Sequence, residues 1–211
     1  MELIARVWDQ FEKLKLSFFK WRMVTSIINK FLLAIAFAAL TGLLAQAKIY
    51  LPWTPVPITG QTMAVLMSGV ILGSVWGGIS QIIYVSLGVL GVPWFASGKF
   101  GLSALVGPTG GYLVGFVVAS FFMGHVIDKH LLKKSSGNFW KIIGFLLFAN
   151  FAIIYGFGLT GLGSWMSLAK GSSVSFWGLL KMGLLPFIVG DLLKLGFVSM
   201  VTLISLPHTN D

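Results

Sequence analysis

The 32 residues from Gln61 to Val92 contain no Asp, Glu, Lys or Arg. A surface segment in water rarely runs so far without charge, because charged side chains dominate the exposed positions of soluble proteins. The whole chain is similar: 10% of its 211 residues are charged and its mean hydropathy is +0.91, whereas soluble domains spend about a quarter of their residues on charges. The sequence therefore predicts an integral membrane protein.

A helix needs roughly 20 apolar residues to cross a hydrocarbon core of about 30 Å. The uncharged run is too long for one comfortable span, and we interpret it as two short helices broken at Gly73-Ser74. The predicted fold is an all-α bundle of six transmembrane helices. Its spans cover 31–47, the two halves of 61–92, 111–127, 140–157 and 186–206.

Three connecting segments have compositions that disfavour a long helix. Residues 51–58 contain three prolines, which fix φ and restrict the residue before them, so we expect an extended outer segment. Residues 93–110 combine glycines with prolines and predict a second long loop. Residues 158–184 mix Gly, Ser and Trp and predict a loop with a short interfacial helix.

The first 26 residues differ from the remainder, which gives two units, 1–26 and 27–211. Apolar residues recur in the first unit at helical spacing, and four cations accompany them, so we expect an amphipathic helix on the membrane surface rather than a cleaved signal peptide. The apolar residues are Ile4, Val7, Trp8, Phe11, Leu14 and Phe18, and the cations are Lys13, Lys15, Lys20 and Arg22.

The distribution of basic residues predicts the orientation. Cytoplasmic loops carry an excess of Lys and Arg, and a cytoplasmic N-terminus puts ten on that side and four outside. The ten are Arg6, Lys13, Lys15, Lys20, Arg22, Lys30, Lys129, Lys133, Lys134 and Lys141, and the four are Lys48, Lys99, Lys170 and Lys181. We therefore expect both termini in the cytoplasm of a multi-pass cell-membrane protein, and we interpret the net charge of +9 as topology rather than nucleic-acid binding.

Asp191 is the one acidic residue inside a predicted span, and Lys194 lies three residues later on the same helix face. A charge in hydrocarbon costs a few kcal/mol at least on insertion scales, so it usually has a partner or a role. One interpretation is a self-neutralising pair. The other, which we prefer, is a polar ligand site beneath the two outer loops.

Further polar groups could complete such a site. They are Thr59, Gln61, Tyr84, Asn150 and Tyr155, although a lone polar residue in a membrane helix commonly makes an interhelical hydrogen bond instead. The segment from Gly107 to Gly111, which includes Thr109, precedes a predicted helix, and its free backbone N–H groups could bind a carboxylate.

Small residues recur at every fourth position in three stripes, which lets helix backbones approach closely. The stripes are Ala34, Ala38 and Gly42; Gly69, Gly73 and Gly77; and Gly111, Gly115 and Ala119. Some of these faces must pack internally, and the first is the candidate for docking another protein.

Several kinds of chemistry are excluded or disfavoured. The chain has no cysteine, so it has no disulfide and no thiolate site. Gly98-Lys99 lacks the context of a phosphate-binding loop, the three histidines lack metal-ligand spacing, and no serine hydrolase arrangement is evident. We expect neither an enzyme nor a bound cofactor, and any uphill transport must draw its energy from another protein.

Four motifs in the same order resemble the BioY family of biotin transporters. They are Pro55-Val-Pro-Ile-Thr59 with Gln61-Thr62; Tyr84-x-x-x-Gly88-x-x-Gly91-x-Pro93-x-Phe95; Gly107-Pro-Thr-Gly-Gly-Tyr112; and Pro186 with Gly190-Asp-x-x-Lys194. The resemblance runs from about residue 31 to 206. One departure is the turn from Ser74 to Gly77, which often carries basic residues in the family and has none here.

The resemblance implies a substrate-binding S component of an energy-coupling-factor (ECF) vitamin transporter. By analogy Asp191 would accept hydrogen bonds from the ureido ring of biotin, Lys194 would donate to a polar ligand atom, and Thr59, Gln61 and Tyr84 would complete the polar shell. Phe95 and Trp94 would cover the thiophane ring, and either Lys99 or the Gly107–Gly111 backbone would bind the carboxylate.

The family also implies partners, namely a transmembrane coupling protein and two ATPase subunits, with Ala34, Ala38 and Gly42 resembling the docking surface. Three alternatives remain open from the sequence: an S component for another vitamin, an intramembrane enzyme that uses Asp191 as an acid or base, and a purely structural membrane subunit.

Overall fold

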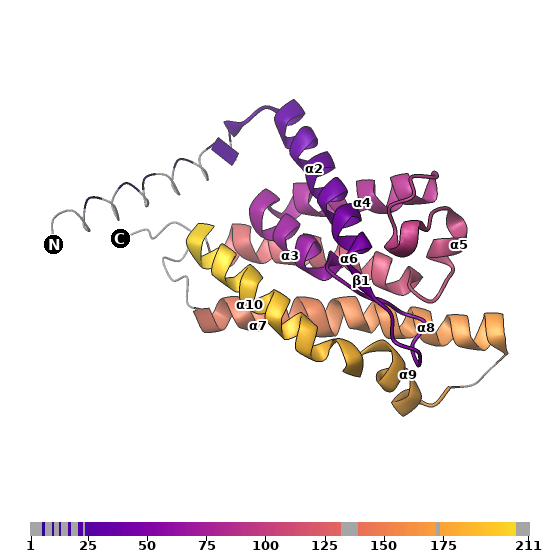
Figure 1. Ribbon diagram of the computed structural model, residues 1–211. Helices are drawn as coiled ribbons and strands as arrows, with labels where there is room; N and C mark the ends of the chain where they lie inside the picture. Colours follow the sequence, from indigo (N-terminus) through magenta and orange to yellow (C-terminus); the bar gives the residue numbers. More distant parts are fainter. Residues whose placement is uncertain are drawn as a thin grey trace.

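The computed structural model describes residues 21–22, 24–131, 139–171 and 174–205, together with residues 6, 10, 13 and 17. Most of these residues are helical (Figure 1). The helices are α2 (Ile27–Gln46), α3 (Gln61–Leu72), α4 (Ser74–Val89), α5 (Leu102–Leu105), α6 (Gly110–Val126), α7 (Phe139–Leu147), α8 (Tyr155–Lys170), α9 (Phe176–Gly183) and α10 (Ile188–Ser205). Two π-helical segments, Ile127–Leu131 and Phe148–Ile154, and two 3-10 turns, Ala96–Gly98 and Leu185–Phe187, complete the helical elements described. The predicted amphipathic segment 1–26 lies mostly outside the described residues.

Four helical stretches among the described residues are long and apolar enough to cross a membrane. They are Ile27–Gln46, Gly110–Lys129, Phe139–Ala169 and Phe176–Ser205. Helices α3 and α4 are apolar but shorter, with 12 and 16 residues. Gly73 separates them with φ of +85°, a conformation that glycine adopts without steric cost, which confirms the predicted break.

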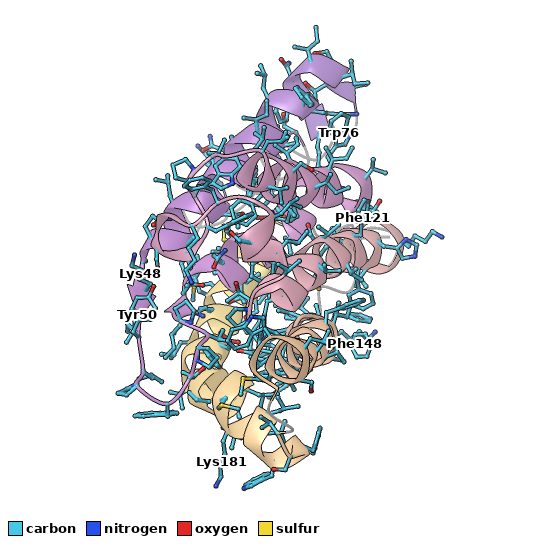
Figure 2. The ribbon with its side chains drawn as sticks, turned by 90° about the vertical axis from the view of Figure 1, so that its right-hand side faces the viewer. Lys48, Tyr50, Trp76, Phe121, Phe148 and Lys181 are labelled. Carbon is cyan, nitrogen blue, oxygen red and sulfur yellow. The ribbon has the colours of Figure 1, made fainter. Side chains whose placement is uncertain are left out.

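Helix α6 packs against α3, α4 and α8, while α2 covers α3 and α4, and α10 lies against α3 and α7 (Figure 1). Large apolar side chains also cover outer faces of the bundle. Leu193 is 74% exposed and Phe148 53%, and Figure 2 shows Phe148 pointing away from the helices. Exposed apolar surface of this extent is expected for helices that face lipid.

Two of the small-residue stripes bring backbones together, as expected. A Cβ atom on Gly77 would lie 2.7 Å from Gly69 Cα, so α3 and α4 touch at their glycines. A Cβ atom on Gly115 would lie 2.9 Å from Ile154 Cα, and one on Gly111 would lie 3.0 Å from Gly161 Cα. These contacts are too close for any larger side chain, which explains the glycine spacing.

The expectation that Ala34, Ala38 and Gly42 form a docking face needs correction. Ala34 and Ala38 are both fully buried, and a Cβ atom on Gly42 would lie 3.0 Å from Trp94 Cβ. This face of α2 is occupied by the chain itself, because its small residues admit α3, α4 and the loop at Trp94. It offers no free surface to a partner.

The prediction of a loop over 158–184 is wrong for its first half. The α7, π and α8 segments form one apolar helix from Phe139 to Ala169. Its glycines mark close contacts rather than breaks: a Cβ atom on Gly158 would lie 2.3 Å from the ring of Tyr112. The expected short helix is present as α9.

The two predicted long loops are present, and both reach the same region. Residues 48–59 form a hairpin in which Lys48–Ile49 (β1) pairs with Ile58–Thr59 (β2). The Thr54 hydroxyl donates to the carbonyl of Met182, which ties this hairpin to α9. Residues 93–109 contain a 3-10 turn and the four-residue α5, and Figure 2 shows Lys48, Tyr50 and Lys181 on the exterior.

Candidate ligand-binding site

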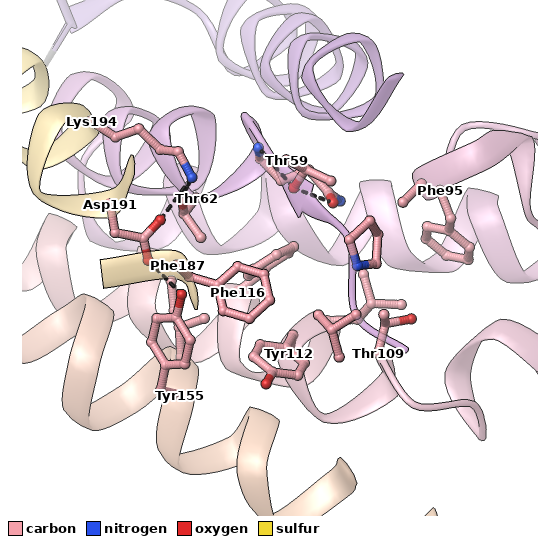
Figure 3. A pocket seen from close by; sticks show the side chains of 16 residues that line it. Thr59, Thr62, Phe95, Thr109, Tyr112, Phe116, Tyr155, Phe187, Asp191 and Lys194 are labelled. Carbon is pink, nitrogen blue, oxygen red and sulfur yellow. Dashed lines mark hydrogen bonds and ion pairs between the residues drawn. The ribbon is translucent and has the colours of Figure 1, made fainter. Parts of the chain in front are cut away.

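A pocket opens beneath these loops (Figure 3). Its walls come from residues 56–62, from Phe95 and Ala96, from the first turns of α6, and from segments 154–155 and 187–194. The space between its lining atoms, including the open mouth, is about 580 Å³.

Asp191 stands in the first turn of α10 and is 2% exposed. The helix begins after the 3-10 turn that contains Pro186. The local sequence therefore places a carboxylate at the pocket wall.

Lys194 follows one helical turn later and is the cationic partner. Its Nζ lies 2.7 Å from Asp191 Oδ1 and donates to the Thr62 hydroxyl at 3.3 Å. Both charged residues line the pocket, and Figure 3 shows the ammonium group lying between Asp191 and Thr62. The pair is neutral overall, so the pocket suits a polar ligand without net charge at this end.

The other carboxylate oxygen has two donors from the long helix. Tyr155 Oη donates to Asp191 Oδ2 at 2.6 Å, and Asn150 Nδ2 donates to the same oxygen at 2.8 Å. An ionised carboxylate accepts about four hydrogen bonds in all, and three positions are occupied by these residues and Lys194. The remaining acceptor position belongs to Oδ1, on the Lys194 side of the group, where an N–H of a ligand could bind.

Aromatic rings form the apolar part of the pocket. Phe95, Tyr112, Phe116 and Phe187 line it with Tyr155. The ring of Tyr155 packs edge-on against Tyr112 with centroids 5.8 Å apart, and it lies tilted against Phe187 with centroids 6.1 Å apart. The Tyr112 hydroxyl donates to the carbonyl of Gly183 at 2.7 Å, which fixes the ring that faces the pocket. These surfaces can enclose a compact apolar ring system.

A chain of hydrogen bonds fixes the opposite wall. Thr59 Oγ1 donates to Gln61 Oε1 at 3.0 Å, and Gln61 Nε2 donates to Tyr84 Oη at 2.7 Å. Tyr84 is fully buried beneath Trp94 and Phe95, and Trp94 Nε1 donates to its carbonyl at 2.9 Å. Tyr84 and Trp94 therefore support the wall from behind and do not line the pocket.

The structure brings most of the predicted site residues together. Those that line the pocket are Asp191, Lys194, Thr59, Gln61, Phe95, Thr109 and Tyr155. Lys99 is exposed and does not line the pocket. Gly107 and Gly111 border a separate surface groove beside Gly161 and Trp165, because the first turn of α6 packs closely on α8.

Sequence reasoning missed several lining residues, chiefly Thr62, Tyr112, Phe116 and Phe187. Thr62 and Tyr112 belong to the motifs that carry the family resemblance, so a signal was present. Phe116 lies one turn after Tyr112, and Phe187 follows Pro186. Aromatic residues in a membrane helix look alike whether they face lipid, a neighbouring helix or a ligand.

Comparisons with known proteins show the family of this chain. The BioY family model matches residues 14–208. The chain is 50% identical over 129 residues to the probable biotin transporter BioY of Methanothermobacter thermautotrophicus, covering 61% of this chain and 80% of that protein. It is 36% identical over 158 residues to the biotin transporter BioY of Thermotoga maritima, covering 74% and 85%.

A solved structure shares the fold. The crystal structure of the S-component for biotin from an ECF-type ABC transporter matches with a TM-score of 0.72 at 24% identity, covering 83% of this chain and 89% of that chain. The family model spans nearly the whole sequence, including every residue of the pocket. This chain belongs to the BioY family.

Proposed function

We propose that this protein is the biotin-binding S component of an ECF transporter, a membrane subunit that captures the vitamin for an ATP-driven coupling module. Family membership and the named activity of the relatives support this proposal. An intramembrane enzyme built on Asp191 is set aside, because the family consists of transporters. The observation that carries the binding site is the open acceptor position on Asp191 beside the Lys194 ammonium group.

The chemistry of biotin matches the pocket. The ureido ring offers N–H donors, one of which can bind the open acceptor position on Asp191 Oδ1, and a carbonyl that can accept from Lys194 and Thr62. The apolar thiophane ring fits among Phe95, Phe116 and the other aromatic rings. The valerate carboxylate then lies toward Thr59 and Thr109, which Figure 3 shows on the far side of the pocket from Asp191. This placement replaces Lys99 and the glycine backbone as the expected carboxylate contacts.

The membrane arrangement follows from the same proposal. Counting α3 and α4 as short spans gives six crossings, with the pocket on the outer side and both termini in the cytoplasm. Residues 1–26 would anchor the chain at the inner surface, and 27–211 would form the binding domain. A transmembrane coupling subunit, working with two ATPase subunits, would meet α2 on its exposed face, which carries Ile28, Leu32 and Leu43.

Isothermal titration of the detergent-purified protein with biotin tests the function. We expect saturable binding with one site per chain and a rise in melting temperature, since a ligand that binds only the folded state stabilises it. Thiamine and riboflavin are titrated in the same way as comparison ligands. Binding of either one in preference to biotin would indicate an S component for another vitamin, and a melting temperature that no vitamin raises would indicate a structural subunit.

A further inference from the structure

The π-helical segment Phe148–Ile154 interrupts an otherwise regular helix directly behind the pocket. Its hydrogen bonding links Asn150 and Tyr155, because the backbone N–H of Tyr155 donates to the carbonyl of Asn150, five residues earlier, as well as to that of Ala152. Turns of this kind are rare and are frequent at functional sites. The sequence gives no signal for it, since neither Pro nor Gly lies within the segment.

The π turn changes which side chains share a face. In an α-helix of 3.6 residues per turn, residues five apart point about 140° away from each other. A turn closed by hydrogen bonds between residues five apart places them on nearly the same side. Asn150 and Tyr155 accordingly both donate to Asp191 Oδ2, at 2.8 and 2.6 Å. A regular helix could direct only one of the two toward that oxygen.

Asn150 acts behind the carboxylate rather than in the pocket. It is fully buried and is absent from the pocket lining that includes Asp191, Lys194 and Tyr155. Its other amide atom, Oδ1, is buried and has no hydrogen-bond partner among the described residues. Leaving a buried acceptor unpaired is unfavourable, whereas leucine has the same branched skeleton and no such atom. The contribution of the amide is therefore the hydrogen bond that it donates to Asp191.

The Asp191–Lys194 pair alone does not fix the direction of the carboxylate. The two residues lie three apart on one helix, and both groups end flexible side chains. With Oδ2 held from the long helix, Oδ1 is left facing Lys194 and the pocket. We infer that Asn150, presented by the π turn, is a positioning residue that orients the Asp191 carboxylate for a ligand N–H group. This inference rests on the proposed function for the identity of the ligand.

The test compares two ligands on one variant. Asn150→Leu should lower the affinity for biotin by about tenfold to a hundredfold, the size of one hydrogen bond to a charged group. A biotin derivative methylated on both ureido nitrogens cannot donate to Asp191, so its weaker binding should change little. The ratio of the affinity for biotin to the affinity for the methylated derivative should therefore be smaller in Asn150→Leu than in the wild type. Thr160→Val is the matched control and should leave the ratio unchanged, because it removes an exposed hydroxyl whose hydrogen bonds, among the described residues, are to its own helix backbone.

Equal losses of affinity for both ligands would show that Asn150 merely supports the fold, and unchanged biotin affinity would also overturn the inference. A second measurement needs no ligand. Melting temperatures of the wild type, Asn150→Leu, Asp191→Asn and the double variant should be non-additive, because residues in contact couple energetically. Additive shifts would contradict the contact. If the wild type bound no biotin but the coupling were present, the proposed function would fail while the positioning of Asp191 by Asn150 stood.

Discussion

Two ion pairs lie at opposite ends of helix α6, and they are built differently. At its C-terminal end, Arg22 pairs with Asp128, 106 residues away in sequence. Asp128 also accepts from the backbone N–H of Ser74 at 2.8 Å, and Arg22 donates to the carbonyl of Ile71 at 3.3 Å. This pair connects the segment before α2, the α3–α4 break and the end of α6.

The ion pair at the pocket end is local in sequence, and its links to other helices are hydrogen bonds to Thr62, Asn150 and Tyr155. Asp191 and Lys194 lie three residues apart on α10, so their contact closes no long loop of chain. The carboxylate retains an acceptor position toward a pocket, whereas Asp128 Oδ2 already accepts from both the N–H and the hydroxyl of Ser74. The difference indicates that sequence separation and spare hydrogen-bonding capacity distinguish a pair that connects distant segments from the pair that we propose to bind a ligand.

The difference in role between the two ion pairs is tested most directly by making the same substitution in both. Asp191→Asn should weaken biotin binding by about a hundredfold or more, because the acceptor loses its charge and Lys194 loses its partner. Asp128→Asn is the matched control and should change biotin affinity by less than about threefold, since it lies away from the pocket. Titration calorimetry measures both. Comparable losses in the two variants would mean that binding responds to general stability.

The reverse experiment measures stability. Asp128→Ala leaves the largely buried guanidinium of Arg22 without its carboxylate, and breaking such a pair is destabilising. Because the Asp128 side chain is 32% exposed, we expect a loss of about 1–3 kcal/mol rather than the full cost of a buried pair. Lys129→Ala, at the exposed neighbouring position, should cost less than about 0.5 kcal/mol. Equilibrium unfolding in detergent measures the free energy of unfolding of both variants. Equal losses would contradict the structural role of Asp128.

The two pairs also show what a sequence reveals. Asp191 and Lys194 could be predicted because charges in an apolar span stand out and because their spacing of three places them on one helix face. The Arg22–Asp128 contact could not be, since nothing local links residues so far apart. Asn150 was visible as a polar residue, but its contact with Asp191 depends on a π turn that has no composition signal.

Glycine produced the main error in the predicted fold. Between 158 and 170 its frequency suggested a loop, as it would in a soluble protein, yet the segment is helical, and Gly158 and Gly161 face Tyr112 and Gly111. At Gly73 the same residue does end a helix, with a positive φ. Composition alone does not distinguish a glycine that ends a helix from one that lets two helices pack closely. The first role depends on the backbone conformation and the second on a neighbouring helix.

Removing the positive charge alone separates the contribution of Lys194 to biotin affinity from that of Asp191. Lys194→Met keeps the length of the side chain but removes the donor to Asp191 Oδ1 and Thr62. Asp191 keeps its two donors on Oδ2, so we expect a loss of biotin affinity of about tenfold, smaller than for Asp191→Asn. Lys181→Met, on the exposed side of α9, is the matched control. A loss as large as that of Asp191→Asn would show that the ammonium group, rather than the carboxylate, dominates recognition.

The smallest expected effect concerns the end of the pocket farthest from both charges. Thr109 precedes α6 and lines the pocket opposite Asp191 (Figure 3), where the proposed pose places the valerate carboxylate. Thr109→Val keeps the shape and removes one hydroxyl donor, so biotin affinity should fall about threefold to tenfold, while the carboxamide of biotin should lose less because it lacks the charge. Competition binding of the two ligands measures the difference. If Thr109→Val weakened both equally, the carboxylate would lie elsewhere, and the ligand would be oriented by the Asp191 end alone.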